Sequence, residues 1–296
     1  IIKIINNSTI LSFLLFLFFI VVLDAQDSSI NKRIDINRTV SVIPFDMAFR
    51  FDEDDTDYSL MLTERIQGVM VQSRRFIMVE RIQMQKSLKL IKDINIDNPN
   101  LYEHWRTVSN SHLVEAGKQL GIEFIITGSI TNVTYPMLRS GGYGCDLSFT
   151  IKALSVETGK VEYTESISVS TEKLIGKNSK REALNSVFEK AIPPLEQFVD
   201  KYFPVEAPFY KIKERDKKGR PKTIVIKGGM ANGLRHKQDL DISIIVSEDY
   251  KDKIGEVEII EIEEKFSICK VKYGAEQIKQ QAEKDSSKII ARSITH

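Results

Sequence analysis

Cysteine and histidine are scarce in this 296-residue chain, which contains two cysteines and four histidines. Cys145 and Cys269 fall in different predicted domains, so a disulfide framework is not expected. A structural zinc site needs cysteine and histidine ligands close together in the sequence, and no such cluster is present. His104 and His112 are eight residues apart, about two helical turns, but residues 98–109 do not have the pattern of a continuous helix that would bring them together. The sequence therefore predicts no metal site.

Motifs for phosphate binding and for covalent catalysis are also missing. The chain has no Gly-x-x-x-x-Gly-Lys loop, no Gly-x-Gly-x-x-Gly after a strand, no Gly-x-Ser-x-Gly and no His-Glu-x-x-His. The glycine-rich stretch 141–144 precedes a predicted strand, so it places no helix N-terminus beside an anion, and we interpret it as a mobile loop. We predict a non-enzymatic protein without catalytic or cofactor-binding residues, without a cofactor and without a small-molecule substrate.

The chain has little excess charge, with 42 Lys and Arg, 41 Asp and Glu, and a formal net charge of +1. Nucleic acid is therefore not an expected partner. The densest basic run lies between residues 211 and 222. In a hairpin, Lys211, Lys213 and Arg215 would share one face and could contact anionic lipid or glycan at a membrane periphery. The alternative is that these side chains are solvated and protect a strand edge against pairing.

An acidic run covers residues 52–57. Calcium binding would need an Asp-x-Asp-x-Asp-Gly pattern with a closing Glu, and that pattern is absent. The alternative is that these carboxylates favour the positive end of the helix that follows.

The first residues have the pattern of an export signal. Lys3 precedes an apolar run from Ile10 to Val22, which is shorter than the roughly twenty residues that span a bilayer. We predict a signal peptide over residues 1–25, cleaved after Ala25, with an uncleaved anchor as the alternative. Residues 26–38 are predicted to be a flexible lead. The protein is thus expected to be exported, to the periplasm or to the periplasmic face of the outer membrane.

A buried strand over residues 121–130 organises a predicted α/β domain at 39–204. The predicted strands cover 39–45, 76–80, 121–130, 146–156 and 160–169, and the predicted helices cover 57–73, 84–92, 111–120 and 179–202. Residues 93–110 are predicted to be a loop that carries a short helix. Ser111 is the predicted cap of its helix, Gly121 its end, and Pro193-Pro194 is expected to kink or divide the last helix. This order of elements predicts layers around a mixed sheet.

The second half of the chain has the pattern of a small barrel at 207–274. Short alternating stretches separated by turn residues predict strands over 209–213, 223–227, 240–247, 254–262 and 268–273. Residues 275–296 are predicted to be a polar tail. The expected fold class is therefore α/β or α+β, with a layered mixed-sheet domain followed by a small all-β barrel domain.

Four segments of the first domain resemble the curli assembly and transport family CsgG. They are Val40-Ser-Val-Ile-Pro-Phe45, Phe76-Ile-Met-Val-Glu-Arg81, Leu120-Gly-Ile-Glu-Phe-Ile-Ile-Thr-Gly-Ser-Ile130 and Leu154-Ser-Val-Glu-Thr-Gly-Lys160. The resemblance covers roughly residues 39–204 and implies the α/β fold also found in TolB N-terminal domains and in LpoB, an activator of peptidoglycan synthases. The second domain resembles the small C-terminal barrel of the flagellar protein FlgT.

The chain departs from the channel-forming members of that family. They insert two long β-hairpins per subunit, whereas the corresponding stretches here, 134–144 and 171–180, are too short for two membrane strands, which need about twenty residues. We therefore expect a periplasmic binding or assembly module associated with curli-type secretion or surface-structure assembly. Its partners would be envelope proteins or a second copy of the chain. The alternatives are an outer-membrane secretion channel subunit and an LpoB-like activator of a peptidoglycan synthase.

Overall fold

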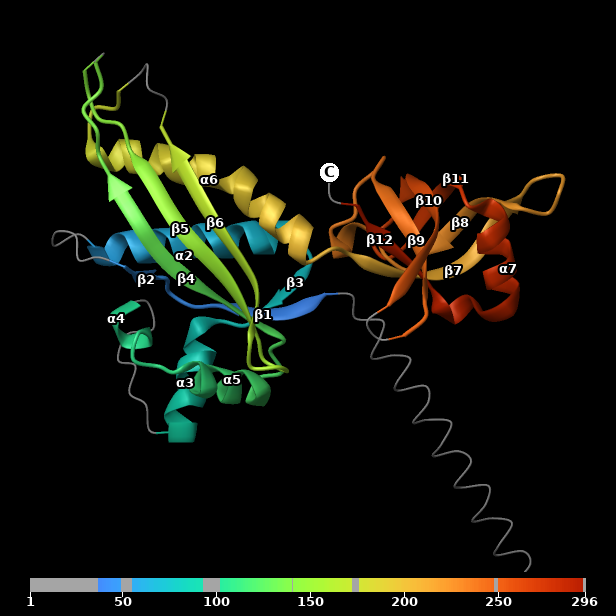
Figure 1. Ribbon diagram of the computed structural model, residues 1–296, viewed down its shortest axis with the longest axis horizontal. Coiled ribbons are helices and arrows are strands. Elements are labelled where there is room, and N and C mark those ends of the chain that lie inside the picture. The colour runs from blue at the N-terminus through green and yellow to red at the C-terminus, as the bar shows by residue number, and fades with distance from the viewer. Residues whose placement is uncertain are drawn as a thin grey trace, which may run out of the picture. The chain divides into compact units, whose positions relative to one another are not determined.

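The computed structural model describes residues 37–48, 55–92, 102–139, 141–171, 176–247 and 250–294. These described residues belong to one compact unit. The chain builds a helix-covered mixed sheet and then a closed barrel (Figure 1), which confirms the predicted fold class. The predicted signal peptide, residues 26–36 of the lead and acidic residues 52–54 lie outside the described residues.

The sheet has the strand order β3-β1-β4-β5-β6, with β2 paired to β4. The strands are β1 (Arg38–Val42), β2 (Asp46–Met47), β3 (Phe76–Met78), β4 (Phe124–Thr134), β5 (Asp146–Ser155) and β6 (Val161–Ser170). Pairing is parallel from β3 to β1 and β4 and antiparallel from β4 to β5 and β6. The predicted hairpin turn is confirmed, since Gly159 has a positive φ of 69°.

Helices cover this sheet on its two faces. They are α2 (Asp55–Ser73), α3 (Arg81–Lys92), α4 (Tyr102–Trp105), α5 (Asn110–Gln119) and α6 (Lys180–Tyr202). An apolar stripe of α2, including Leu62, Ile66 and Met70, is buried together with Phe149 and Phe188 in a core between the sheet and α2 and α6. A smaller core on the opposite face joins α3, α4 and α5 to Ile125 of β4 and Leu154 of β5.

One local prediction is wrong, and for another the structure excludes one of its two alternatives. Ser109, and not Ser111, caps α5, because its hydroxyl oxygen accepts a hydrogen bond from the His112 amide at 3.4 Å. Pro193 and Pro194 do not divide α6, which runs unbroken to Tyr202. Each proline removes one backbone donor, but the buried stripe on both sides holds the helix against the sheet.

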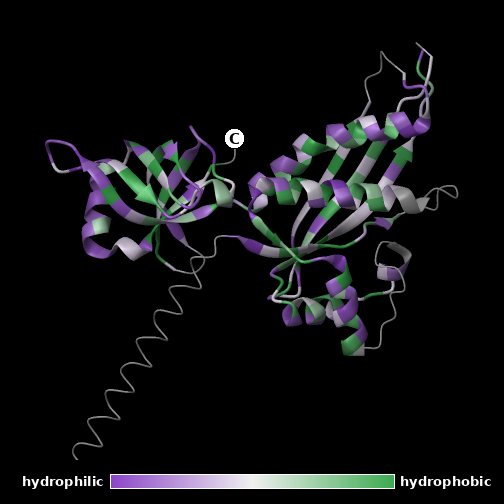
Figure 2. Ribbon diagram, turned by 180° about the vertical axis from the view of Figure 1, so that it is seen from behind, coloured by the Kyte–Doolittle hydropathy of each residue, from purple (hydrophilic) through white to green (hydrophobic). Residues whose placement is uncertain are grey.

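The barrel is closed by six strands in the order β10-β11-β8-β7-β12-β9. They are β7 (Glu206–Arg215), β8 (Pro221–Ile226), β9 (Asp239–Ile245), β10 (Lys251–Ile262), β11 (Ser267–Tyr273) and β12 (Ile289–Ser293). Its buried interior includes Ile224, Ile242, Val257, Ile259 and Cys269. Figure 2 shows apolar and polar residues alternating along the strands, as expected when one face of each strand points inward.

The prediction of a polar tail over 275–296 is wrong. Residues Ala275–Asp285 form helix α7, and β12 then inserts between β7 and β9 to close the barrel. Ile289 and Ala291 are each 1% exposed, which explains why this short stretch becomes a strand. The other domain boundaries remain our proposal, with the change placed between the end of α6 and the start of β7.

Candidate interaction surface

Two connections meet at one end of the sheet. They are residues 135–145, between β4 and β5, and residues 176–180, before and at the start of α6; we call their described residues the sheet tip (Figure 1). Tyr143 forms bridges with both Met137 and Lys177. Its amide donates to the Lys177 carbonyl at 2.8 Å, and the Lys177 amide donates back at 2.9 Å. The two connections therefore form one paired structure.

Glycine makes this close pairing possible. Gly142 has a φ of 82°, and a Cβ on it would lie 2.7 Å from the Lys177 carbonyl oxygen. A Cβ on Gly176 would lie 1.9 Å from the Gly141 carbonyl oxygen. The interpretation of residues 141–144 as a mobile loop is thus corrected to a loop that backbone hydrogen bonds hold on both sides.

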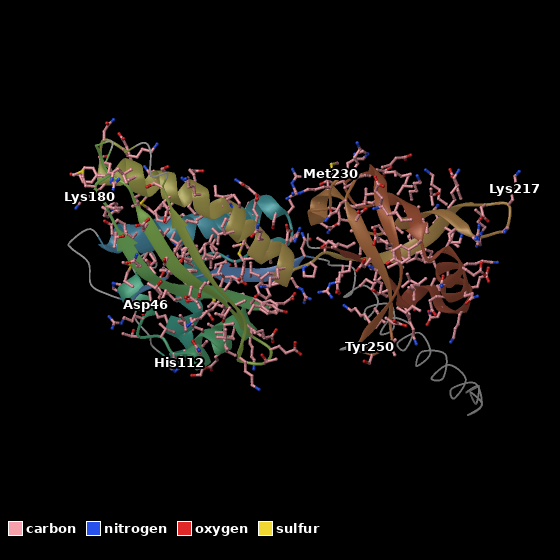
Figure 3. All side chains as sticks on the ribbon, turned by 45° about the horizontal axis from the view of Figure 1, so that its top comes forward. Asp46, His112, Lys180, Lys217, Met230 and Tyr250 are labelled. Atoms are coloured by element: carbon pink, nitrogen blue, oxygen red, sulfur yellow. The ribbon has the colours of Figure 1, made fainter. Side chains whose placement is uncertain are left out.

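The side chains of the sheet tip combine apolar, aromatic and basic groups. Met137 is 68% exposed. The Lys180 ammonium lies 5.5 Å from the centre of the Tyr135 ring, and Arg139 is exposed nearby in the sequence. Figure 3 shows Lys180 at this end of the sheet. Methionine, tyrosine and arginine are enriched at protein interfaces, so this surface has the composition of a docking site.

The rest of the face formed by β4, β5 and β6 is polar. Opposed residues share a face of the sheet, and here the pairs are Ser129 with Thr150, Thr150 with Ser166, and Ser148 with Ser168. Ser148 and Ser168 are hydrogen bonded at 2.9 Å. These hydroxyl groups bond across the strands and present no apolar anchor, so this face is a weaker candidate than the sheet tip.

Part of the β6 edge is shielded by α6. Lys201 donates to the Glu165 carboxylate at 2.9 Å, and the Tyr202 hydroxyl donates to it at 2.8 Å. These hydrogen bonds lower the pKa of Glu165, because they favour the charged carboxylate. The middle of this edge, around Glu165, is therefore engaged within the chain.

A groove of about 450 Å³ lies between α2 and the start of α3. Its lining residues are Glu64, Gln67, Gly68, Val71, Gln72, Glu80 and Arg81. Burial lowers the pKa of Arg81, and its Nη1 is buried without a hydrogen-bond partner. Two carboxylates face one guanidinium in this groove, so the charges do not indicate one class of ligand.

The histidines do not come together into a site. His104 lies within the short helix α4 and His112 lies in the first turn of α5, while the His236 ring lies 3.0 Å from the Ile260 carbonyl oxygen. In the described part of the chain, no three His, Cys, Asp or Glu side chains are grouped as metal ligands would be. The acidic run enters α2 at Asp55, in agreement with the helix-end alternative.

Both cysteine thiols are expected to be unreactive in the folded protein. Burial raises the pKa of Cys145 and of Cys269 to about 12. Because the thiolate is the nucleophile, we expect alkylation at about pH 8 to be at least ~100-fold slower than in the denatured chain. Counting alkylated cysteines by mass spectrometry checks this, and fast labelling of both under native conditions would contradict it.

The same shifts give a pH dependence of stability. An unfolded thiol titrates at about 8.5, so the unfolded chain loses these protons before the folded chain does. The stabilisation that the two raised pKa values contribute is fully present below the pKa of the unfolded thiol, and it falls as the pH rises toward 12. The denaturant midpoint of unfolding should therefore decrease from neutral to alkaline pH. The midpoint of a Cys145→Ala, Cys269→Ala double variant should decrease less over the same range.

The basic hairpin differs from its prediction. Bulges between Phe209 and Lys211 and between Ile212 and Glu214 interrupt the alternation that would place Lys211, Lys213 and Arg215 on one face. Lys213 lies 3.7 Å from the Glu261 carboxylate, and Arg215 lies 3.9 Å from that of Glu283. The face expected to contact lipid or glycan is thus not formed as predicted.

No protein-family model matches the sequence, and no curated protein matches it. Among solved structures, the LpoB C-terminal domain from Escherichia coli is similar at 12% identity and a TM-score of 0.34, over 46% of this chain and 84% of that chain. Lipoprotein GNA1162 from Neisseria meningitidis is similar at 10% identity and a TM-score of 0.36, over 53% of this chain and 97% of that chain. TolB from Acinetobacter baumannii is similar at 10% identity and a TM-score of 0.28, over 78% of this chain and 57% of that chain.

Similarities this weak support no functional conclusion, and the resemblance to the CsgG family remains a prediction from the sequence. Among the described residues, no helix is both long enough and apolar enough to span a membrane.

Proposed function

We propose that this chain is an exported, non-enzymatic protein of the cell envelope. It acts as a binding or assembly module in the periplasm or on the periplasmic face of the outer membrane, in curli-type secretion or surface-structure assembly. The apolar run near the start of the sequence and the resemblance to the CsgG family support the location. The sheet tip carries the proposal for the mechanism, because a paired backbone presents an exposed methionine among aromatic and basic side chains.

The sheet tip suits a protein partner for two physical reasons. Its backbone is already ordered by hydrogen bonds between the two connections, so little conformational entropy is lost when a partner binds. Met137 supplies apolar area that becomes buried, while Arg139 and Lys180 can pair with carboxylates at the rim of the interface. The expected partner is therefore an envelope protein with an apolar pocket and an acidic border, or a second copy of this chain.

The secretion-channel alternative is less well supported. Two membrane strands and a turn need about twenty residues. The β4–β5 connection covers only residues 135–145, and the connection from β6 to α6 covers only 171–179. An LpoB-like activator would differ from our proposal in its partner and not in its mode of binding.

Cell fractionation and two activity assays separate these three functions. We expect carbonate washing to release the protein from envelope membranes, no conductance in a planar bilayer, and no stimulation of glycan polymerisation by a purified peptidoglycan synthase. Steady conductance would replace the proposal by the channel function. Stimulated polymerisation would replace it by the activator function.

Replacing Met137 by aspartate is expected to reduce partner recovery without unfolding the protein. Loss of one buried apolar side chain costs about 1.5–3 kcal/mol of binding free energy, which corresponds to at least about tenfold in affinity. The amount of envelope protein that co-purifies with each variant measures this effect. Leu90→Asp is the matched control, since Leu90 is 84% exposed on α3, away from the sheet tip. Equal recovery with both variants would contradict a role for Met137.

A further inference from the structure

A β-bulge places an aromatic and a basic residue side by side on the outside of the barrel. In β7, Phe209 is paired with Ile226 and Lys211 with Val225, so Tyr210 is the extra residue of the bulge. Tyr210 is 49% exposed, and Lys211 follows it on the outer surface. Without the bulge, strict alternation would point one of these two side chains into the barrel.

Two neighbouring strands add to this pair. Ile226 of β8 lies opposite both Phe209 of β7 and Ser267 of β11, which brings Tyr210, Lys227 and Phe266 together. The rings of Tyr210 and Phe266 have centroids 5.6 Å apart. The ammonium groups of Lys211 and Lys227 lie 5.4 and 5.5 Å from the Tyr210 ring centre. We call these four residues the aromatic–lysine cluster.

The charges around the cluster favour an anionic partner. Within the part of the chain that the structure describes, neither Lys211 nor Lys227 has a carboxylate at ion-pair distance, and each instead contacts the Tyr210 ring. The adjoining residues 211–222 contain seven basic and two acidic side chains. Figure 3 shows Lys217 projecting from the turn of this hairpin. Exposed lysines next to exposed aromatic rings are typical of residues that lie in the interface of a membrane.

We propose that the aromatic–lysine cluster docks the barrel on an anionic lipid surface. Tyr210 and Phe266, which is 37% exposed, would enter the headgroup region while Lys211 and Lys227 contact lipid phosphates. An acidic glycan fits less well, because the two rings are inclined at 49° and offer no common flat surface for a sugar ring. Glu263 and Glu264 lie in the turn beside Phe266, so their carboxylates oppose this docking.

A fluorescence reporter on the full chain tests this proposal. Phe266→Trp places a tryptophan in the cluster, while the native Trp105 is only 4% exposed and should respond little. We expect a blue shift and quenching by brominated lipids with vesicles that contain phosphatidylglycerol, and much less of either with phosphatidylcholine alone. A local reporter is needed because the apolar run near the N-terminus could itself bring the chain to vesicles. Leu90→Trp, on α3, is the control and should not be quenched.

Charge variants in the Phe266→Trp background complete the test. Lys211→Ala with Lys227→Ala should weaken the lipid response about 30-fold, at about 1 kcal/mol for each lysine near an anionic surface. Glu263→Gln with Glu264→Gln should strengthen it. Quenching that is equal in both vesicle types and unaffected by salt would overturn the proposal. The proposal would also be overturned if the fluorescence of the Phe266→Trp variant responded to an acidic polysaccharide but not to vesicles. Either result leaves the role of the sheet tip untouched, because Met137 is not involved.

Discussion

Replacing Gly128 by alanine is expected to unfold the α/β part of the chain. A Cβ at this position of β4 would lie 1.9 Å from the Thr150 carbonyl oxygen and 2.5 Å from a ring carbon of Phe45. Phe45 is fully buried and Thr150 belongs to the neighbouring strand, so neither can move away without disrupting the sheet. We expect the free energy of unfolding to fall by more than about 3 kcal/mol. This is more than the usual cost of overpacking that shifts of side chains can relieve.

Two local probes measure this loss in denaturant. The fluorescence of buried Trp105 reports on the smaller core of the α/β part, and alkylation of Cys145 reports on the start of β5. If the barrel is a separate domain, as we propose, Cys269 should stay protected in the Gly128→Ala variant. The control is Gly68→Ala, because a Cβ on Gly68 of helix α2 meets nothing within 4 Å. The free energy of unfolding of the Gly68→Ala variant should rise by about 0.5–1 kcal/mol. Similar decreases in both variants would contradict the packing described for Gly128.

Ending the chain after Lys288 is expected to open the barrel. This truncation removes β12, which pairs with β7 on one side and with β9 on the other. Ile289, Ile290 and Ala291 are buried, and each large apolar side chain contributes about 1.5–3 kcal/mol. Loss of the strand also leaves backbone groups of β7 and β9 without partners, so the remaining strands cannot close.

The truncation gives a result specific to the barrel. Cys269 of β11 should become reactive toward an alkylating reagent at neutral pH, while Trp105 fluorescence should keep its native value. A chain that ends after Ile294 keeps β12 and is the matched control. Protection of Cys269 after removal of β12 would contradict the role of this strand in closing the barrel.

The elements that could be predicted from the sequence are those with local signals. The strand at 121–130 and the helix before it are marked by an apolar run, by a periodic face and by Gly121, which has a positive φ of 66°. The hairpin around Gly159 has the same advantage, since a turn and two alternating strands are adjacent in the chain. Five of the six barrel strands follow the same rule.

The features that could not be predicted depend on contacts between distant residues. β12 contains only a few apolar residues between polar ones, and its partners Glu206–Pro208 lie far earlier in the chain. The bridge between Tyr143 and Lys177 is also non-local, so no sequence pattern indicates that the two connections of the sheet tip are paired. The bulge that exposes Tyr210 arises from strand register, which no local pattern specifies.

Site-specific photo-crosslinking in native envelopes tests the central proposal, that the sheet tip is the docking surface of this protein. A photoreactive residue replaces Met137 in one variant and Leu90, which is 84% exposed on α3, in the other. We predict a discrete crosslinked product from position 137, containing either one envelope protein or a second copy of the chain, and no such product from position 90. The same products from both positions, or a discrete product from position 90 alone, would contradict the account.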